Sequence, residues 1–102
     1  MYQIIIKNGI VIDPANRFHG QADVAVAEGK IAGIGQYSND AVMVVDASGC
    51  NVTPGLIDHH AHLYPLAKIG IPAEAMCFSS GVTTAVDAGS TGCDIFSANI
   101  LF

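Results

Sequence analysis

Three polar residues near the middle of the chain, Asp58, His60 and His62, could hold and orient a metal ion. If residues 56–62 are extended, successive side chains alternate between two faces, so these three share one face and His59 points the other way. The α-carbons of His60 and His62 would then be about 6.6–6.8 Å apart, close enough for both rings to converge on one ion. Neutral imidazole binds zinc, nickel and iron, and Asp58 suits orienting a ligand rather than binding the metal. Because His-x-His alone is a common pattern, its surroundings decide how much it means.

The residues around the histidines are typical of a strand, a helix and a second strand. Residues 55–60 suit a buried strand, and residues 82–87 are rich in the β-branched side chains that favour strands. Residues 72–80 suit a short helix, because Pro72 stands in the first turn and Gly81 follows the end. This order predicts a βαβ unit with parallel strands, which is too small to form a stable sheet alone.

The first half of the chain carries β-branched runs separated by turn residues, which predict a small β layer. Asn8-Gly9 is the strongest two-residue signal for a tight turn, so we expect a hairpin around it. Glu28-Gly29 marks a second strand-turn-strand unit. The runs are residues 3–13, 22–26, 30–34 and 42–45.

The chain changes character at Thr53-Pro54-Gly55, after the last of these runs and the turn at Asp46-Ala47-Ser48-Gly49. A turn-rich segment between two differently patterned regions indicates a domain boundary. We therefore assign residues 1–52 to one domain and residues 53–102 to the beginning of another.

Pro54 to His62 reads Pro-Gly-Leu-Ile-Asp-His-His-Ala-His and resembles the Pro-Gly-x-x-Asp-x-His-x-His signature of the amidohydrolase superfamily. The resemblance extends over residues 3–92. The N-terminal turns resemble those of the β-sandwich half-domain that precedes the barrel in this superfamily. Gly81-Val82-Thr83-Thr84 with Asp87-Ala88-Gly89 resembles the second barrel strand of its dihydroorotase-like or deacetylase-like branch.

The resemblance implies a β-sandwich half-domain followed by the first βαβ unit of a (β/α)8 TIM barrel. It implies hydrolysis of the C–N bond of a small amide or cyclic amide, or of a small ester, through a metal-bound hydroxide, with one or two divalent ions, most typically zinc, and with His60 and His62 as ligands. A barrel needs at least about 200 residues, so the other ligands and the catalytic aspartate would lie downstream. The 102 residues are therefore expected to be an N-terminal fragment of the parent enzyme, inactive by itself, with no catalytic residue beyond the orienting role suggested for Asp58.

Other interpretations remain open at this point. The chain could be a non-catalytic metal-binding or interaction module, or part of a superfamily deaminase or esterase. Asp87 could reach the metal pocket or cap the following turn. Residues 89–92 could contact substrate or form an ordinary loop between a strand and a helix.

The composition of the chain limits the kinds of partner that it is expected to bind. The net charge is −5, and the four basic residues are scattered along the chain, so no basic stripe is available for nucleic acid. No apolar run is long enough for a membrane span and the start lacks the pattern of a signal peptide, which favours a cytoplasmic protein without membrane contact. Only 13% of residues are charged and 51% are hydrophobic, so much of the surface should be covered, and a homo-oligomeric parent is compatible with this. Cys50, Cys77 and Cys93 fit no metal or disulfide spacing and are expected to be reduced and mostly buried.

Overall fold

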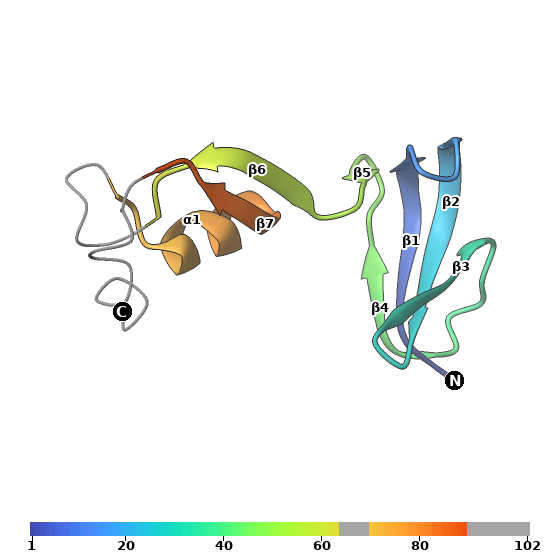
Figure 1. Cartoon of the computed structure of the whole chain (residues 1–102). Coiled ribbons are helices and arrows are strands. Elements are labelled where there is room, and N and C mark those ends of the chain that lie inside the picture. The colour runs from blue at the N-terminus through green and yellow to red at the C-terminus, as the bar shows by residue number, and fades with distance from the viewer. Residues whose placement is uncertain (64–69, 90–102) are drawn as a thin grey trace. The chain divides into compact units, whose positions relative to one another are not determined.

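The computed structural model describes residues 1–63 and 70–89, and the chain divides into two compact units, Met1–Pro54 and Gly55–Phe102 (Figure 1). The first unit is a β-sheet, and the described part of the second is a pair of strands with one helix. The elements in chain order are β1 (Tyr2–Asp13), β2 (Phe18–Ala27), β3 (Lys30–Gly35), β4 (Ala41–Asp46), β5 (Asn51–Val52), β6 (Leu56–Ala61), α1 (Ala73–Ser80) and β7 (Val82–Asp87).

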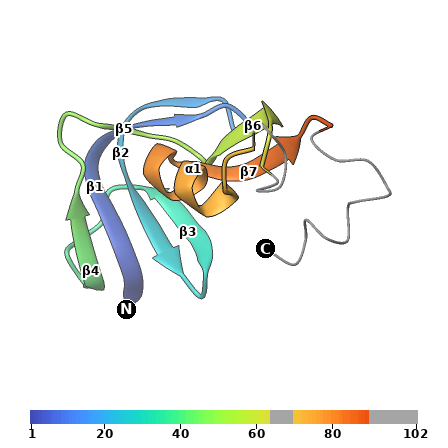
Figure 2. The ribbon, with the colours of Figure 1, turned by 90° about the vertical axis from the view of Figure 1, so that its left-hand side faces the viewer.

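The sheet of the first unit has the order β3-β2-β1-β4, and β5 also pairs with β1 (Figure 2). The central strand β1 is antiparallel to β2 but parallel to β4 and β5. Along one edge, β1 pairs first with β4, up to Lys7 opposite Asp46, and then with β5, from Ile10 opposite Asn51. One long strand thus pairs directly with three others, and β3 joins the sheet through β2.

The hairpin predicted around Asn8-Gly9 is wrong, because β1 runs straight through these residues. Asn8 does have the positive φ that its sequence favours, 66°, but it uses it in a β-bulge. Ile6 pairs with Val24 and Gly9 with Ala22, so two residues of β1 stand opposite Asp23 alone. Asn8 tolerates the left-handed conformation equally well in a bulge and in a turn.

The first hairpin turn lies instead between β1 and β2. Asp13 Oδ1 accepts a hydrogen bond from the backbone N–H of Asn16 at 3.4 Å, and Asp13 Oδ2 accepts one from Asn16 Nδ2 at 2.7 Å. The second turn is confirmed: Glu28 and Gly29 have φ values of 52° and 71° and join the antiparallel strands β2 and β3. Positive φ at both positions is the geometry of a two-residue hairpin loop.

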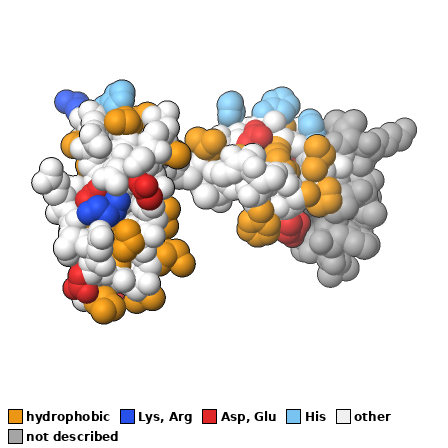
Figure 3. Space-filling model, turned by 180° about the vertical axis from the view of Figure 1, so that it is seen from behind, with side chains coloured by type: hydrophobic (Ala, Val, Ile, Leu, Met, Phe, Trp, Pro, Cys, Tyr) orange, Lys and Arg blue, Asp and Glu red, His pale blue; other side chains and the backbone are white. Residues whose placement is uncertain are grey.

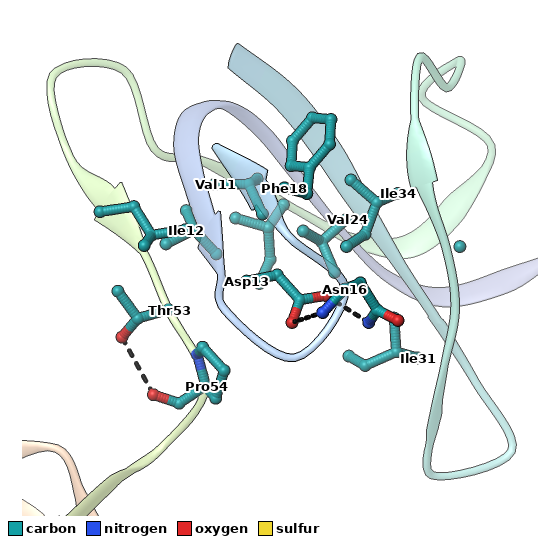
Figure 4. Close-up of a pocket in the computed structure, with 13 residues that line it drawn as sticks. Val11, Ile12, Asp13, Asn16, Phe18, Val24, Ile31, Ile34, Thr53 and Pro54 are labelled. Atoms are coloured by element: carbon teal, nitrogen blue, oxygen red, sulfur yellow. Dashed lines mark hydrogen bonds between the residues drawn. The ribbon is translucent and has the colours of Figure 1, made fainter. Parts of the chain in front are cut away.

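The core of the first unit is a small cluster on the β1–β2 pair, Val11, Ala22 and Val24, with Ile6, Ile34 and Val52 packed against it. All of these side chains except Ala22 border a hollow of about 680 Å³ that is lined mostly by apolar groups, among them Phe18 and Ile31 (Figure 4). Ile31 is 62% exposed. Within the described residues, this face of the sheet is therefore only partly covered.

The edge strand β4 is also exposed, since Val42, Met43, Val44 and Val45 are all at least 40% accessible. Cys50 is exposed as well, contrary to the expectation that the cysteines are mostly buried, and Cys77 is half-buried; both are free thiols. Cys93 lies outside the described residues. Among the helices in the described part of the chain, none has the length and apolar character that a membrane crossing requires.

In the second unit, β6 and β7 form a parallel pair connected through α1, which confirms the predicted strand-helix-strand order. Pro72 precedes the helix as its N-cap, and Gly81 ends it in the left-handed conformation with φ 72°. The prediction that β6 is buried is wrong for the described residues, because Leu56 is 52% and Ile57 68% exposed. Two strands and an eight-residue helix offer too little surface to cover both faces of a strand.

Candidate metal centre

The two histidines of the motif lie together where β6 ends. His60 is in the strand and His62 follows its last residue, Ala61. Their ring centroids are 5.6 Å apart and the ring planes meet at 74°. His60 is exposed and His62 half-buried, and histidine side chains reach the surface of this unit (pale blue in Figure 3).

This separation suits two ligands of one ion. A metal about 2.0–2.1 Å from a ring nitrogen lies roughly 3.2 Å from the ring centroid, so two rings on one ion have centroids up to roughly 6.4 Å apart. The observed 5.6 Å lies inside that limit. Neutral imidazole is also the donor type that zinc and other first-row metals accept. The residues present therefore fit a divalent metal as a pair of ligands.

Asp58 contacts the backbone of the motif. One of its carboxylate oxygens accepts a hydrogen bond from the backbone N–H of His60 at 3.1 Å, which holds the polypeptide between the two residues. Within residues 1–63 and 70–89, the His, Cys, Asp and Glu side chains form no group of three that could hold a metal. The described residues thus bring two imidazoles together, and both their role as metal ligands and the role of Asp58 toward a ligating ring stay predictions.

Asp87 fixes the polypeptide just after the histidines. Its Oδ2 accepts a hydrogen bond from the backbone N–H of Leu63 at 2.7 Å, and Ala61 stands opposite it in the β6–β7 register. The backbone N–H of Ala88 also donates to the carbonyl of Ala61 at 2.8 Å. The carboxyl ends of both parallel strands are therefore joined next to His62. Of residues 89–92, only Gly89 lies within the described part.

Gly55, whose packing role no local pattern indicates, allows β6 to begin close to β7. A Cβ on Gly55 would collide with the side chain of Thr83, with Thr83 Cβ only 2.7 Å away. The backbone N–H of Leu56 also donates to the carbonyl of Gly81 at 3.0 Å. The glycine after Pro54 was visible in the sequence, but its partner on β7 was not.

No family model matches the chain, whereas individual relatives do. The chain is 48% identical over 62 residues to the FwdA protein of Methanocaldococcus jannaschii, 42% identical over 60 residues to a dihydroorotase of Elusimicrobium minutum, and 48% identical over 62 residues to an allantoinase of Escherichia coli. The matches cover 60%, 58% and 61% of this chain but only 10%, 14% and 13% of the three relatives. The chain thus spans a small share of the length of the proteins it matches.

Solved structures cover more of the chain. A D-aminoacylase variant in complex with CuCl2 aligns with 86% of this chain at a TM-score of 0.69 and 36% sequence identity. The alignment covers 19% of the aminoacylase. The N-acyl-D-glutamate deacylase of Bordetella bronchiseptica, complexed with zinc and a phosphonate inhibitor, aligns with 82% of this chain at a TM-score of 0.67 and 35% sequence identity. The alignment covers 18% of the deacylase. A D-hydantoinase aligns with 85% of this chain at a TM-score of 0.63 and 36% sequence identity, and the alignment covers 20% of the hydantoinase.

The sequence motif, the parallel strand pair that carries it and these likenesses agree on one relationship. The relatives named dihydroorotase, allantoinase, D-hydantoinase and D-aminoacylase are members of a single superfamily, and the similarity reaches 82–86% of this chain in the structural alignments. This chain corresponds to a short N-terminal part of such proteins and belongs to the amidohydrolase superfamily.

Proposed function

We propose that this chain supplies the first two metal ligands, His60 and His62, of a hydrolase that cleaves a C–N bond in a small amide or cyclic amide. The observation that carries the proposal is the pair of imidazoles with centroids 5.6 Å apart at the carboxyl end of the first parallel strand. Active sites of barrels built from parallel strands lie at the carboxyl ends of those strands. Residues 1–52 would then be the N-terminal part of a β-sandwich domain and residues 53–102 the start of a (β/α)8 barrel.

The names of the relatives support the reaction class and the metal. Dihydroorotase, allantoinase and hydantoinase are names of enzymes for cyclic amides, and the aminoacylase and deacylase names indicate open amides. The Bordetella deacylase structure contains zinc, and a D-aminoacylase has a binuclear metal centre. We extend these properties to the parent of this chain as one or two divalent ions, with zinc preferred, and a small-molecule substrate handled in the cytoplasm.

The residues have distinct tasks in this proposal. A bound divalent ion lowers the pKa of its water and polarises a carbonyl group, which is the chemistry that amide hydrolysis needs. His60 and His62 would hold that ion from one side. The carboxylate of Asp58 holds the backbone N–H of His60, and that of Asp87 holds the N–H of Leu63. These two backbone hydrogen bonds would fix the end of β6 that carries the two rings.

A second candidate is a metal-binding module without catalysis. It rests on the same two imidazoles, which lie together at the end of β6. Catalytic zinc sites normally have three protein ligands and an open position. The two candidates share the histidine pair and differ in whether a longer parent protein containing this chain hydrolyses amides.

The first experiment is a zinc titration of the chain followed by NMR of the histidine ring nitrogens. We expect the resonances of His60 and His62 to shift together while those of His19 and His59 stay in place. The His60→Ala, His62→Ala double variant should bind zinc at least about tenfold more weakly, because both imidazole ligands are removed. The matched control is His59→Ala, on the same strand and also exposed.

Equal zinc affinity in the wild type, the double variant and His59→Ala would contradict the ligand assignment. If the assignment holds, hydrolysis assays on the longer parent separate the two candidates. Ring opening of a cyclic amide to a product with a new carboxylate and a new amino group by the metal-loaded parent, and its loss in the double variant, supports the enzyme. Metal binding without turnover across open and cyclic amides supports the module.

A further inference from the structure

A buried carboxylate lies at the β-bulge of the first unit, far along the chain from the metal motif. Asp23, on β2, is only 7% exposed and is the buried charged residue of the described part. It stands opposite the two bulged residues of β1, Lys7 and Asn8. Burying a charge is costly unless hydrogen bonds and a counter-charge compensate for it.

The compensation comes from three directions. Asp23 Oδ1 accepts a hydrogen bond from the backbone N–H of Asn8 at 3.0 Å, and Oδ2 accepts one from the backbone N–H of Tyr37 at 3.0 Å. The ammonium group of Lys7 lies 3.3 Å from Oδ2 and also donates to the carbonyl of Tyr37. We call Lys7, Asn8, Asp23 and Tyr37 the Asp23 cluster. The cluster joins β1, β2 and the segment between β3 and β4. Along the chain, Asp23 lies 15 residues from Asn8 and 14 residues from Tyr37.

The contacts reach the neighbouring strands through Asn8 and Tyr37. Asn8 Nδ2 donates to Asp46 Oδ1 at 3.2 Å, at the point where β1 changes its partner from β4 to β5. The ring of Tyr37 packs edge-on against Tyr2 at 5.3 Å between centroids, near the start of β1. A Cβ on Gly33 would collide with the hydroxyl of Tyr37. One carboxylate therefore secures both the bulge and the position of an aromatic ring.

We propose that Asp23 is an acid-sensitive switch: ionised, it holds the β1 bulge and the segment leading to β4 in place, and protonated, it releases both while the β1–β2 core persists. Protonation removes the negative charge that strengthens both backbone hydrogen bonds, and it places a proton on one of the two acceptor oxygens. Lys7 would lose its counter-charge at the same time. The core pair Ile5 and Ala25, both fully buried, does not depend on the carboxylate.

The sign of the pH effect follows from the surroundings of the carboxyl. Burial alone raises the pKa of Asp23, but the hydrogen bonds from Tyr37 and Asn8 and the charge of Lys7 outweigh it and lower the pKa below the ordinary 3.8. The contribution of Asp23 to stability is therefore complete above about 3.8 and is lost as the pH falls through the lower pKa of the folded state. Seven residues line a second, polar hollow beside Asp23, and the titratable ones among them are Lys7, Asp23 and Tyr37. Asp46 faces Asn8 from the end of β4.

The test is NMR of the whole chain between neutral and acid pH, with amide hydrogen exchange corrected for the intrinsic rate. We expect the amide shifts of Asn8 and Tyr37 to titrate with the carboxyl carbon of Asp23 at one midpoint below 3.8. Their protection factors should fall at least about tenfold on acidification, which is the scale of losing one charge-assisted hydrogen bond. Ile5 and Ala25 should keep their protection at that pH.

Substitutions at Asp23 and at a control carboxylate test the same proposal at neutral pH. Asp23→Asn removes the negative charge that strengthens both hydrogen bonds and replaces one of the two acceptor oxygens by an NH2 group, so the same two amides should lose protection at neutral pH. The matched control, Asp13→Asn, changes a carboxylate in an exposed turn and should affect Asn16 alone. If Asp23→Asn does not fold, the wild-type titration decides. Separate midpoints for Asn8 and Tyr37, or loss of protection at Ile5 and Ala25 at the same midpoint, would overturn the proposal.

Discussion

Gly9 shows how a single position can be determined by its neighbours across the sheet. It is buried and follows the bulge in β1. A Cβ placed on it would collide with the side chain of Val52 and approach the Cβ of Ala47 to 3.2 Å. Glycine is required at this position because β5 and the loop before it come close to the backbone of Gly9. The requirement is therefore steric and does not depend on the backbone conformation of Gly9.

Gly9→Ala should therefore destabilise the first unit by about 1–3 kcal/mol, the usual range for overpacking a well-packed site. Gly20→Ala is the matched control on the paired strand, because a Cβ there would meet only Phe18 Cζ at 3.8 Å. Its effect should stay within about 0.5 kcal/mol. Urea unfolding followed by circular dichroism measures both, and equal effects of the two substitutions would refute the steric explanation.

At the same scale, the histidine pair was predictable and its support was not. Alternation along an extended segment predicts that His60 and His62 share a face, and the ring separation of 5.6 Å agrees with that arrangement. The contact between Asp87 and Leu63 joins residues 24 positions apart. Such a contact depends on how β6 and β7 pair, which no local pattern contains.

Among the elements, the hairpin between β2 and β3 carries a visible local conflict. Glu28 has a φ of 52° in a two-residue turn whose second residue is Gly29. A left-handed conformation costs an ordinary residue roughly 1–2 kcal/mol, whereas asparagine adopts it more readily. The turn is formed nonetheless, because the strands on both sides pair in a fixed register.

Glu28→Asn should raise the free energy of unfolding of the first unit by about 0.5–1 kcal/mol, since Asn-Gly is the preferred pair for this turn. Glu28→Ala removes the same charge without favouring a positive φ, so it serves as the control. Thermal unfolding of both variants beside the wild type gives the comparison. A stabilisation by alanine as large as that by asparagine would mean that charge, and not backbone conformation, is responsible.

On the scale of the whole molecule, the two units differ in how much they bury. The first contains the buried residues Ile5, Val11, Ala22, Val24, Ala25 and Ala47, while the described part of the second contains only Ala61 among its buried apolar residues. Helix α1 buries none of its residues. Because burial of apolar surface is the main source of stability, the first unit should be the more stable.

Hydrogen exchange of the intact chain can test this difference. We expect amides in the β1–β2 pair to be protected at least about tenfold more than those in the β6–β7 pair, because sub-global opening begins where few apolar contacts must be broken. The adjacent antiparallel strands β2 and β3 provide an internal reference within the first unit. Identical protection in both units would indicate that the chain unfolds as one cooperative body.

The sequence alone determined the features that depend on neighbouring residues. The end of α1 at Gly81, the turn at Glu28-Gly29 and the shared face of the two histidines all follow from local backbone preferences. Tertiary structure decided the rest. Asn8-Gly9 asks for a positive φ that either a turn or a bulge satisfies, and the choice was made by Asp23 and Asp46, which lie on other strands and hold Asn8 in the bulge. A local preference restricts the conformation of one residue, whereas the partner of a strand depends on contacts between residues far apart in the chain.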